Sequence, residues 1–192
     1  MESLQVNYKH KKVAEFIGSP SGKVILSVGG GQCRIMRSLP KDNKFYSIEK
    51  NETIIPKVDG IKFIIQDAQE RFPFGDDSID VCIFSEVLEH LNEPERTIKE
   101  MYRCCKEVII TTPNNTILRR ILFKLMGKSD LVGKNHVKEY GWREVKHMFE
   151  KHGFVLKDFK GICLLSMKVE IDRFPRLSAK MLMRFVKESE KK

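Results

Sequence analysis

Five short apolar runs, rich in valine and isoleucine, recur along the first 113 residues, and each ends in small or polar residues. Runs of this length are typical of β-strands, and strands buried on both faces are apolar almost throughout. The pattern predicts strands at residues 24–28, 45–49, 61–65, 79–84 and 107–111. Because mostly helical patterns lie between them, the strands should run parallel in one sheet.

Apolar residues at helical spacing mark the connections. The expected helices are residues 6–17, 32–39, 93–105 and 144–151. Pro40 follows the second helix, and Pro94 occupies the favoured first turn of the third. The connection at residues 51–60 is short and contains Pro56, so we expect a stunted helix or none there. Strands joined by helices predict an α/β fold with helices on both faces and a ligand crevice at the carboxyl ends of the strands.

The last third of the chain has a different pattern. Residues 154–159 and 162–171 resemble two strands around Gly161, which predicts an antiparallel hairpin at a sheet edge. Residues 178–186 have the spacing of a basic amphipathic helix, which could pack on the sheet or contact a membrane surface. We expect one domain over residues 1–192, with a core at 18–160, a lid or insertion over the site at 113–140 and a basic C-terminal helix at 173–192.

The stretch VILSVGGGQCR, residues 24–34, carries the strongest chemical signal. Gly29, Gly30 and Gly31 follow a strand directly, and glycines let backbone N–H groups approach a ligand because no Cβ blocks the way. Glu49 stands about twenty residues after Gly29, at the end of the next strand. A carboxylate there can accept hydrogen bonds from both hydroxyls of a ribose. The same residues would also fit an ordinary glycine turn and a surface carboxylate without a ligand.

Composition limits the possible partners and location of the protein but does not identify its function. The formal net charge is +9, which favours nucleic acid, phosphorylated metabolites or an anionic membrane surface as partners without choosing among them. The polar N-terminus is unlike a signal peptide, and no run is apolar enough to span a bilayer, so we expect a cytoplasmic protein. The five cysteines include no C-x-x-C pair and the five histidines share no ligand spacing, so neither disulfides nor a metal site is expected.

Taken in order, these landmarks resemble the class I S-adenosylmethionine-dependent methyltransferases, with the closest likeness to the small-molecule branch that contains quinone-biosynthesis enzymes. The likeness covers roughly residues 20–160 and rests on VILSVGGGQC, SIEK, QDA, FPFGDDSIDVCIFSEVLEHL, TTPN and NHVKEYGWREV. It implies a Rossmann-like, doubly wound, mostly parallel seven-stranded sheet, with S-adenosylmethionine as the cofactor. The implied reaction is methyl transfer to a small-molecule or lipid-like acceptor.

The resemblance also implies how the nucleoside end of the cofactor is held. Glu49 would bind the ribose hydroxyls, and Lys50 would lie near the adenine. Asp67 would accept from the adenine amino group, and the backbone of Ala68 would meet the ring edge. A plainer interpretation of Asp67 stays open, since Asp side chains often bind their own backbone in turns.

At the other end of the cofactor, the resemblance implies that Gly29–Gly31 approach the methionine part. The carbonyl of Ser85 would contact the cofactor's ammonium group, and residues from Glu86 to His90 would border the methyl group. His90 and His136 are the candidate general bases, because the histidine pKa lies near neutrality. Both also have plainer interpretations, as a capping or packing residue and as a loop residue.

Two positions depart from the family pattern. The family usually has an acid where Ser27 stands and a third glycine where Cys33 stands. These departures motivate one alternative, a non-catalytic binding module with a degenerate cofactor loop. A nicotinamide-dependent oxidoreductase is disfavoured, because its glycine fingerprint requires a glycine where Arg34 stands.

The acceptor is the least determined part of the prediction. Family pockets are built from the N-terminal helix and the segment after the fifth strand, here residues 115–140, which is basic and partly apolar. This composition favours an anionic or amphipathic acceptor. An RNA or protein methyltransferase stays open as an alternative, although the Asn/Asp-Pro-Pro-aromatic motif of base-methylating enzymes is replaced by Ser-Glu-Val-Leu. The sequence predicts no oligomeric state.

Overall fold

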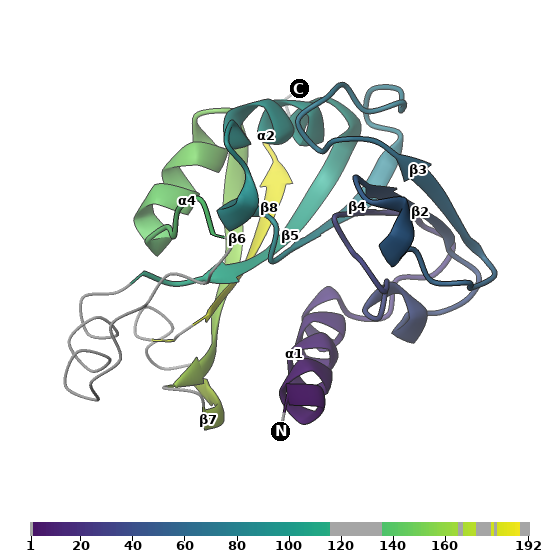
Figure 1. Cartoon of the computed structure of the whole chain (residues 1–192). Coiled ribbons are helices and arrows are strands. Elements are labelled where there is room, and N and C mark those ends of the chain that lie inside the picture. The colour runs from purple at the N-terminus through teal and green to yellow at the C-terminus, as the bar shows by residue number, and fades with distance from the viewer. Residues whose placement is uncertain (1, 116–135, 165–166, 172–177, 179, 189–192) are drawn as a thin grey trace.

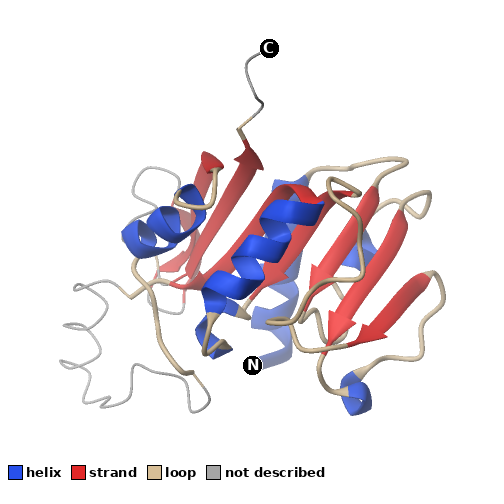
Figure 2. Cartoon of the chain, turned by 90° about the horizontal axis from the view of Figure 1, so that it is seen from above, coloured by secondary structure: helices blue, strands red, loops and turns tan. Residues whose placement is uncertain are grey.

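The computed structural model describes residues 2–115, 136–164, 167–171, 178 and 180–188. Within these residues eight strands form one sheet in the order β3-β2-β1-β4-β5-β8-β6-β7, drawn as arrows in Figure 1 and in red in Figure 2. The strands are β1 (Val24–Val28), β2 (Lys44–Glu49), β3 (Ile61–Ile65), β4 (Ile79–Ser85), β5 (Cys105–Pro113), β6 (Phe154–Leu164), β7 (Met167–Ile171) and β8 (Lys180–Lys187).

The predicted fold class is confirmed. Strands β1 to β5 pair in parallel, and β8 pairs antiparallel with both β5 and β6. The strands from β3 to β6 in this order make the predicted seven-stranded, mostly parallel sheet, and β7 extends it by pairing antiparallel with β6. The sheet order reverses at β1, since β2 and β3 lie on one side of it and β4 and β5 on the other. Ligands of doubly wound sheets bind at this switch point.

Helices cover both faces of the sheet, as expected. The α-helices among the described residues are α1 (Glu2–Ile17), α2 (Pro94–Cys104) and α4 (Trp142–Glu150), and the short 3₁₀ turns are η1 (Met36–Ser38), η2 (Glu52–Ile54) and η3 (Leu88–His90). Helix α1, purple in Figure 1, packs against Ile25, Ile83 and Ile109. Helices α2 and α4 cover the other face, where alternate strand residues such as Leu26 and Cys82 point. Among the described residues, no helix is long and apolar enough to cross a membrane.

Local sequence explains the helix boundaries. Pro94 stands in the first turn of α2, and Ile98, Met101 and Cys104 repeat at the spacing that buries one helical face. Helix α4 begins where the Glu144 carboxylate accepts from the N–H of Gly141 at 2.8 Å. The connection after β2 contains only η2, so the expectation of a stunted helix there is confirmed.

The helix predicted at residues 32–39 was wrong. Gly31 and Cys33 both have positive φ angles, 52° and 50°, which keep the backbone out of the right-handed helical region. Only the single turn η1 fits before Pro40. The stretch after the glycine turn is therefore a compact loop.

The basic C-terminal helix predicted at residues 173–192 was also wrong. Residues 180–187 form strand β8, between β5 and β6. Its side chains Met181, Leu182, Met183 and Phe185 are buried on both faces of the sheet, and a short apolar run of this kind fits a central strand as well as a buried helix.

Two other expectations concern the last third of the chain. The predicted antiparallel pair of strands is present, but Gly161 lies within β6, which extends to Leu164, and β7 begins at Met167. The lid or insertion predicted at residues 113–140 lies mostly outside the described residues.

Candidate functional site

The glycine turn after β1 has the backbone geometry that its sequence predicts. Gly29 and Gly31 have φ angles of 65° and 52°, in the region that side chains disfavour. A Cβ on Gly29 would lie 2.6 Å from a methyl carbon of Val87. The N–H of Gly29 donates to the carbonyl of Ile48 at 2.9 Å, which ties the turn to the end of β2.

A cavity of about 220 Å³ lies between the glycine turn and the carboxyl end of β4. Its wall includes Gly29–Gly31 and Arg34 on one side, Ser85 and Glu86 on the other, and His10 from α1. The cavity therefore presents both positive and negative groups. Since pockets that enclose a whole drug-sized ligand begin at roughly 300 Å³, it suits one polar end of a larger molecule.

Glu49 lies at the end of β2, as predicted, but its carboxylate has partners within the protein. It accepts from the N–H of Gly31 at 2.6 Å and from the Ser47 hydroxyl at 3.2 Å. Its side chain is buried. Burial raises the pKa of Glu49, and the hydrogen bonds from Gly31 and Ser47 oppose that rise. Glu49 thus holds the glycine turn against β2.

Asp67 and Lys50 form an ion pair, with 2.7 Å between Lys50 Nζ and Asp67 Oδ2. The hydrogen bond from Lys50 is the main reason that the pKa of Asp67 lies below its usual value. The other oxygen of Asp67 accepts from the backbone N–H of Gln69 at 2.9 Å, which is the turn geometry left open by the sequence. The carbonyl of Ala68 accepts from the Thr97 hydroxyl at 2.9 Å. These residues lie outside the cavity wall, along the edge beyond Glu49.

Glu86 occupies a strained position at the end of β4. Its φ angle is 59°, which is rare for a residue with a side chain. The Thr111 hydroxyl lies 2.8 Å from that of Ser85 and donates to the Glu86 carboxylate at 3.2 Å. Lys180 of β8 pairs with the same carboxylate. The sequence analysis did not identify Thr111 and Lys180 as site residues, because no residues near them in the sequence predict that β8 pairs with β5.

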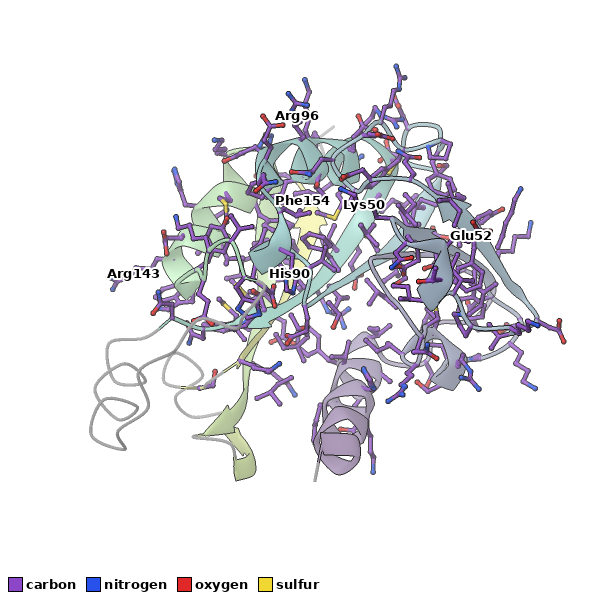
Figure 3. The ribbon with its side chains drawn as sticks, viewed as in Figure 1. Lys50, Glu52, His90, Arg96, Arg143 and Phe154 are labelled. Carbon is purple, nitrogen blue, oxygen red and sulfur yellow. The ribbon has the colours of Figure 1, made fainter. Side chains whose placement is uncertain are left out.

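The two predicted histidines lie together. The ring centroids of His90 and His136 are 4.9 Å apart, with the rings nearly perpendicular. His90 is exposed at the end of η3, below α2 in Figure 3. Beside them, Glu89 is almost fully buried, and both burial and the negative charge of Glu86 raise its pKa. Neither histidine belongs to the cavity wall. The histidine pair is therefore a separate group of candidate residues outside the cavity.

The two departures from the family pattern fill space beneath the glycine turn. Ser27 is buried, and its hydroxyl lies where a Cβ on Gly30 would point. Cys33 keeps the left-handed backbone that a glycine would adopt freely, and its thiol packs 3.5 Å from the Ser47 hydroxyl. Burial raises the pKa of Cys33. The turn geometry therefore survives both substitutions.

Comparison with known proteins agrees with this architecture. Residues 26–108, which contain the glycine turn, β2 to β4 and parts of β1 and β5, match the family model of a methyltransferase domain. No curated protein sequence matches the chain. The family match therefore rests on the part of the chain that carries the cavity.

Solved structures similar to this chain extend the likeness to nearly its whole length. A methyltransferase from Haloferax volcanii, in complex with the Trm112 methyltransferase activator, has a TM-score of 0.74 at 15% identity, over 98% of this chain and 93% of the other. Magnesium protoporphyrin IX methyltransferase from Synechocystis PCC 6803, with bound SAH, has a TM-score of 0.71 at 15% identity, over 96% and 84%. A SAM-dependent methyltransferase from Aquifex aeolicus has a TM-score of 0.65 at 14% identity, over 92% and 88%.

At these identities the structural likeness shows the fold, and the sequence match adds the domain type. Residues 26–108 therefore match a methyltransferase domain, and the chain has the fold of S-adenosylmethionine-dependent methyltransferases.

Proposed function

We propose that the protein transfers the methyl group of S-adenosylmethionine to a small-molecule or lipid-like acceptor that is anionic or amphipathic. The cavity at the switch point of the sheet carries this proposal, because it lies between the glycine turn and the end of β4. Within the methyltransferases, we propose that the chain belongs to the small-molecule branch that contains quinone-biosynthesis enzymes.

The cavity fits the methionine end of the cofactor in space and in charge. A Cβ on Gly31 would meet no atom within 4 Å, so the turn has open space beside it. Arg34 and His10 offer donors for a carboxylate. The Ser85 carbonyl and the Glu86 carboxylate offer acceptors for an ammonium group. The Ser85 carbonyl and the Glu86 carboxylate would take the place of the acid that the family usually has at position 27.

The nucleoside end would lie over the edge beyond Glu49. The Glu49 carboxylate would accept from the ribose hydroxyls while it also accepts from the N–H of Gly31. Lys50 and Asp67 stand at the ends of β2 and β3, where an adenine would meet them and the backbone of Ala68. Binding there would compete with the Lys50–Asp67 ion pair, which costs little to open because Lys50 is exposed.

Alignment of the two reactants is the main task of the protein in this reaction. Bound S-adenosylmethionine supplies a methyl group on a positively charged sulfur, which keeps the bonding electron pair when the acceptor's lone pair forms the new bond to carbon. Glu86, Gly29 and Gly31 have positive φ angles and form two walls of the cavity, between which the reactants would be aligned. Holding reactants in line removes much of the entropic barrier.

An acceptor that must lose a proton also requires a base. His90 and His136 are our candidates, because His90 lies in η3 just after β4 and the His136 ring packs against it. His136 is oriented by a contact of 3.3 Å between its Nδ1 and the buried carboxylate of Glu139. With the proton on Nδ1, the Nε2 lone pair is the one that would take the acceptor's proton.

Charge favours an anionic acceptor. The chain carries a net charge of +9, and residues 115–140, the segment expected to build the acceptor pocket, are basic. A labelled-methyl assay tests this choice directly. The protein and tritium-labelled S-adenosylmethionine are incubated with anionic amphiphiles, their neutral analogues, RNA and protein extracts, each separately. Label on the anionic amphiphiles supports the proposal, and label mainly on RNA or protein contradicts it.

A non-catalytic binding module is the second candidate, favoured by one specific observation. The carboxylates of Glu49 and Asp67 both have hydrogen-bond partners within the protein. A degenerate site would keep these contacts and exclude the cofactor. Calorimetric titration with S-adenosylmethionine separates the two candidates, since only the enzyme must bind it.

A further inference from the structure

Three potential metal ligands converge beside the cavity although their sequence spacing gives no hint of a site. One ligand atom from each of Glu89, His90 and His136 lies within 4.8 Å of the other two, in a search limited to the described residues. Glu89 and His90 belong to η3 after β4, and His136 precedes α4. The cluster therefore joins two distant segments at one point.

Backbone hydrogen bonds build this cluster. The carbonyl of Glu89 accepts from the N–H of Val137 at 2.8 Å and from that of Lys138 at 3.3 Å. These bonds fix the residue next to His136 against η3. The convergence is thus a property of the fold and does not depend on chance orientations of long surface side chains.

The carboxylate of Glu89 is buried and positioned. Glu89 is 1% exposed, and its Oε2 accepts from the hydroxyl of Thr112 on β5 at 2.9 Å. Burying an ionised carboxylate is costly unless a partner compensates for its charge. The donors to this carboxylate, the Thr112 hydroxyl and the backbone N–H of Glu89, are both neutral, so a cation held between Glu89 and the histidines would supply the opposite charge.

His136 has the support that metal-binding histidines usually have. Its Nδ1 lies 3.3 Å from the carboxylate of Glu139, which is 6% exposed. A carboxylate on one ring nitrogen fixes the tautomer and makes the other nitrogen a better ligand. Glu139 would therefore orient His136 from the second layer around an ion.

We propose that Glu89, His90 and His136 bind a divalent transition-metal ion. One carboxylate and two imidazoles suit ions such as Mn²⁺, Fe²⁺, Co²⁺ and Zn²⁺, whereas Mg²⁺ and Ca²⁺ prefer oxygen ligands throughout. Three protein ligands leave coordination positions for water or for an acceptor oxygen.

The use of this ion in catalysis rests on the proposed function. Glu89, the first residue of the site, stands three residues after Glu86 of the cavity wall, so an acceptor oxygen on the ion would lie close to the transferred methyl group. The ion would lower the pKa of an acceptor hydroxyl, which removes the need for a histidine base. Oxygen-bearing acceptors would then be preferred.

Titration of the metal-free protein with Co²⁺ tests the site without cofactor or acceptor. Bound Co²⁺ is followed by its visible absorption, and calorimetry with Mn²⁺ and Zn²⁺ repeats the measurement. We expect one ion per chain, with affinity lowered at least tenfold in Glu89→Gln, His90→Ala and His136→Ala. His147→Ala is the matched control, because this exposed histidine on α4 lies outside the cluster, and its affinity should be unchanged.

Two outcomes would overturn the proposal: no binding by the folded wild-type protein, or equal binding by the wild type and all three cluster variants. Because His90 is exposed, His90→Ala keeps the test decisive even if the Glu89 variant does not fold. Titration of the wild-type protein with S-adenosylmethionine separates failure of the metal site from failure of the proposed function. Absence of metal binding by a wild-type protein that binds S-adenosylmethionine rejects the metal site and leaves the proposed function standing.

Discussion

Glu49 has two roles in this site, since it supports the glycine turn and is also a proposed cofactor ligand. Its buried carboxylate holds the N–H of Gly31 and is also the group expected to receive the ribose. Only the ionised form accepts hydrogen bonds with both oxygens. Its environment therefore links cofactor binding to pH.

Cofactor affinity should increase as the pH rises through the pKa of Glu49. Burial places this pKa above the usual value of 4.5, so the protonated form persists to a higher pH and weakens ribose binding there. Calorimetric titrations over a pH series measure the effect, which Glu49→Gln should abolish. Glu52→Gln is the control, because Glu52 is exposed on η2 and should leave the profile unchanged (Figure 3). A profile that is the same in the wild type and in Glu49→Gln would contradict the role of Glu49.

Two glycines in the same turn should respond differently to alanine. A methyl group on Gly29 collides with Val87, whereas one on Gly31 enters open space beside the cavity. Both pay roughly 1–2 kcal/mol for a positive φ angle, and Gly29→Ala adds the steric cost. Urea denaturation should show the larger loss of stability for Gly29→Ala, and calorimetry should show weaker cofactor binding for Gly31→Ala. Equal stability losses and unchanged binding by Gly31→Ala would show that the turn does not border the cofactor.

Among the elements, β8 differs most from the prediction, because the sequence predicts a helix where the structure has this strand. The strand fills the space between β5 and β6, and its residues reach groups far away in the sequence. Lys180 pairs with Glu86 beside the cavity, and Arg184 pairs with Glu107 of β5. The strand is therefore part of the support of the site.

Arg184→Ala should destabilise the protein by about 1–2 kcal/mol at neutral pH, because Arg184 and Glu107 are both only partly exposed. Burial raises the pKa of Glu107 and Arg184 opposes that rise, so the variant should have a still higher Glu107 pKa. As the pH falls through this raised pKa, Glu107 becomes neutral and the difference from the wild type should shrink. Urea denaturation at neutral and acidic pH measures it.

Arg96→Ala is the matched control for this experiment. Arg96 lies on the outer face of α2 and forms an exposed ion pair with Glu93 (Figure 3). Such a pair contributes roughly 0–1 kcal/mol. A stability loss for Arg184→Ala no larger than that of the control would argue against β8 as an integral strand.

For the whole molecule, the sequence predicts what local patterns determine. The first five strands, the glycine turn and the position of Glu49 follow from apolar runs and their polar ends. The polar ends of parallel strands must meet at one edge, so the place of the cavity could be predicted as well.

What could not be predicted depends on contacts between distant segments. Nothing near residues 180–187 indicates that two strands flank them. The approach of His136 to Glu89 depends on backbone bonds from residues 137 and 138 to η3, which no spacing rule reveals. The sequence therefore indicated no metal site where the folded chain brings three ligands together.

The central claim is that this chain binds S-adenosylmethionine at the cavity, and calorimetric titration tests it most directly. S-adenosylmethionine, S-adenosylhomocysteine and NAD are titrated separately into the wild-type protein. We predict one site per chain for the two adenosyl ligands, with micromolar affinity, and no binding of NAD. Absence of binding by both adenosyl ligands to a folded protein would contradict the claim and leave a binding module on a methyltransferase fold.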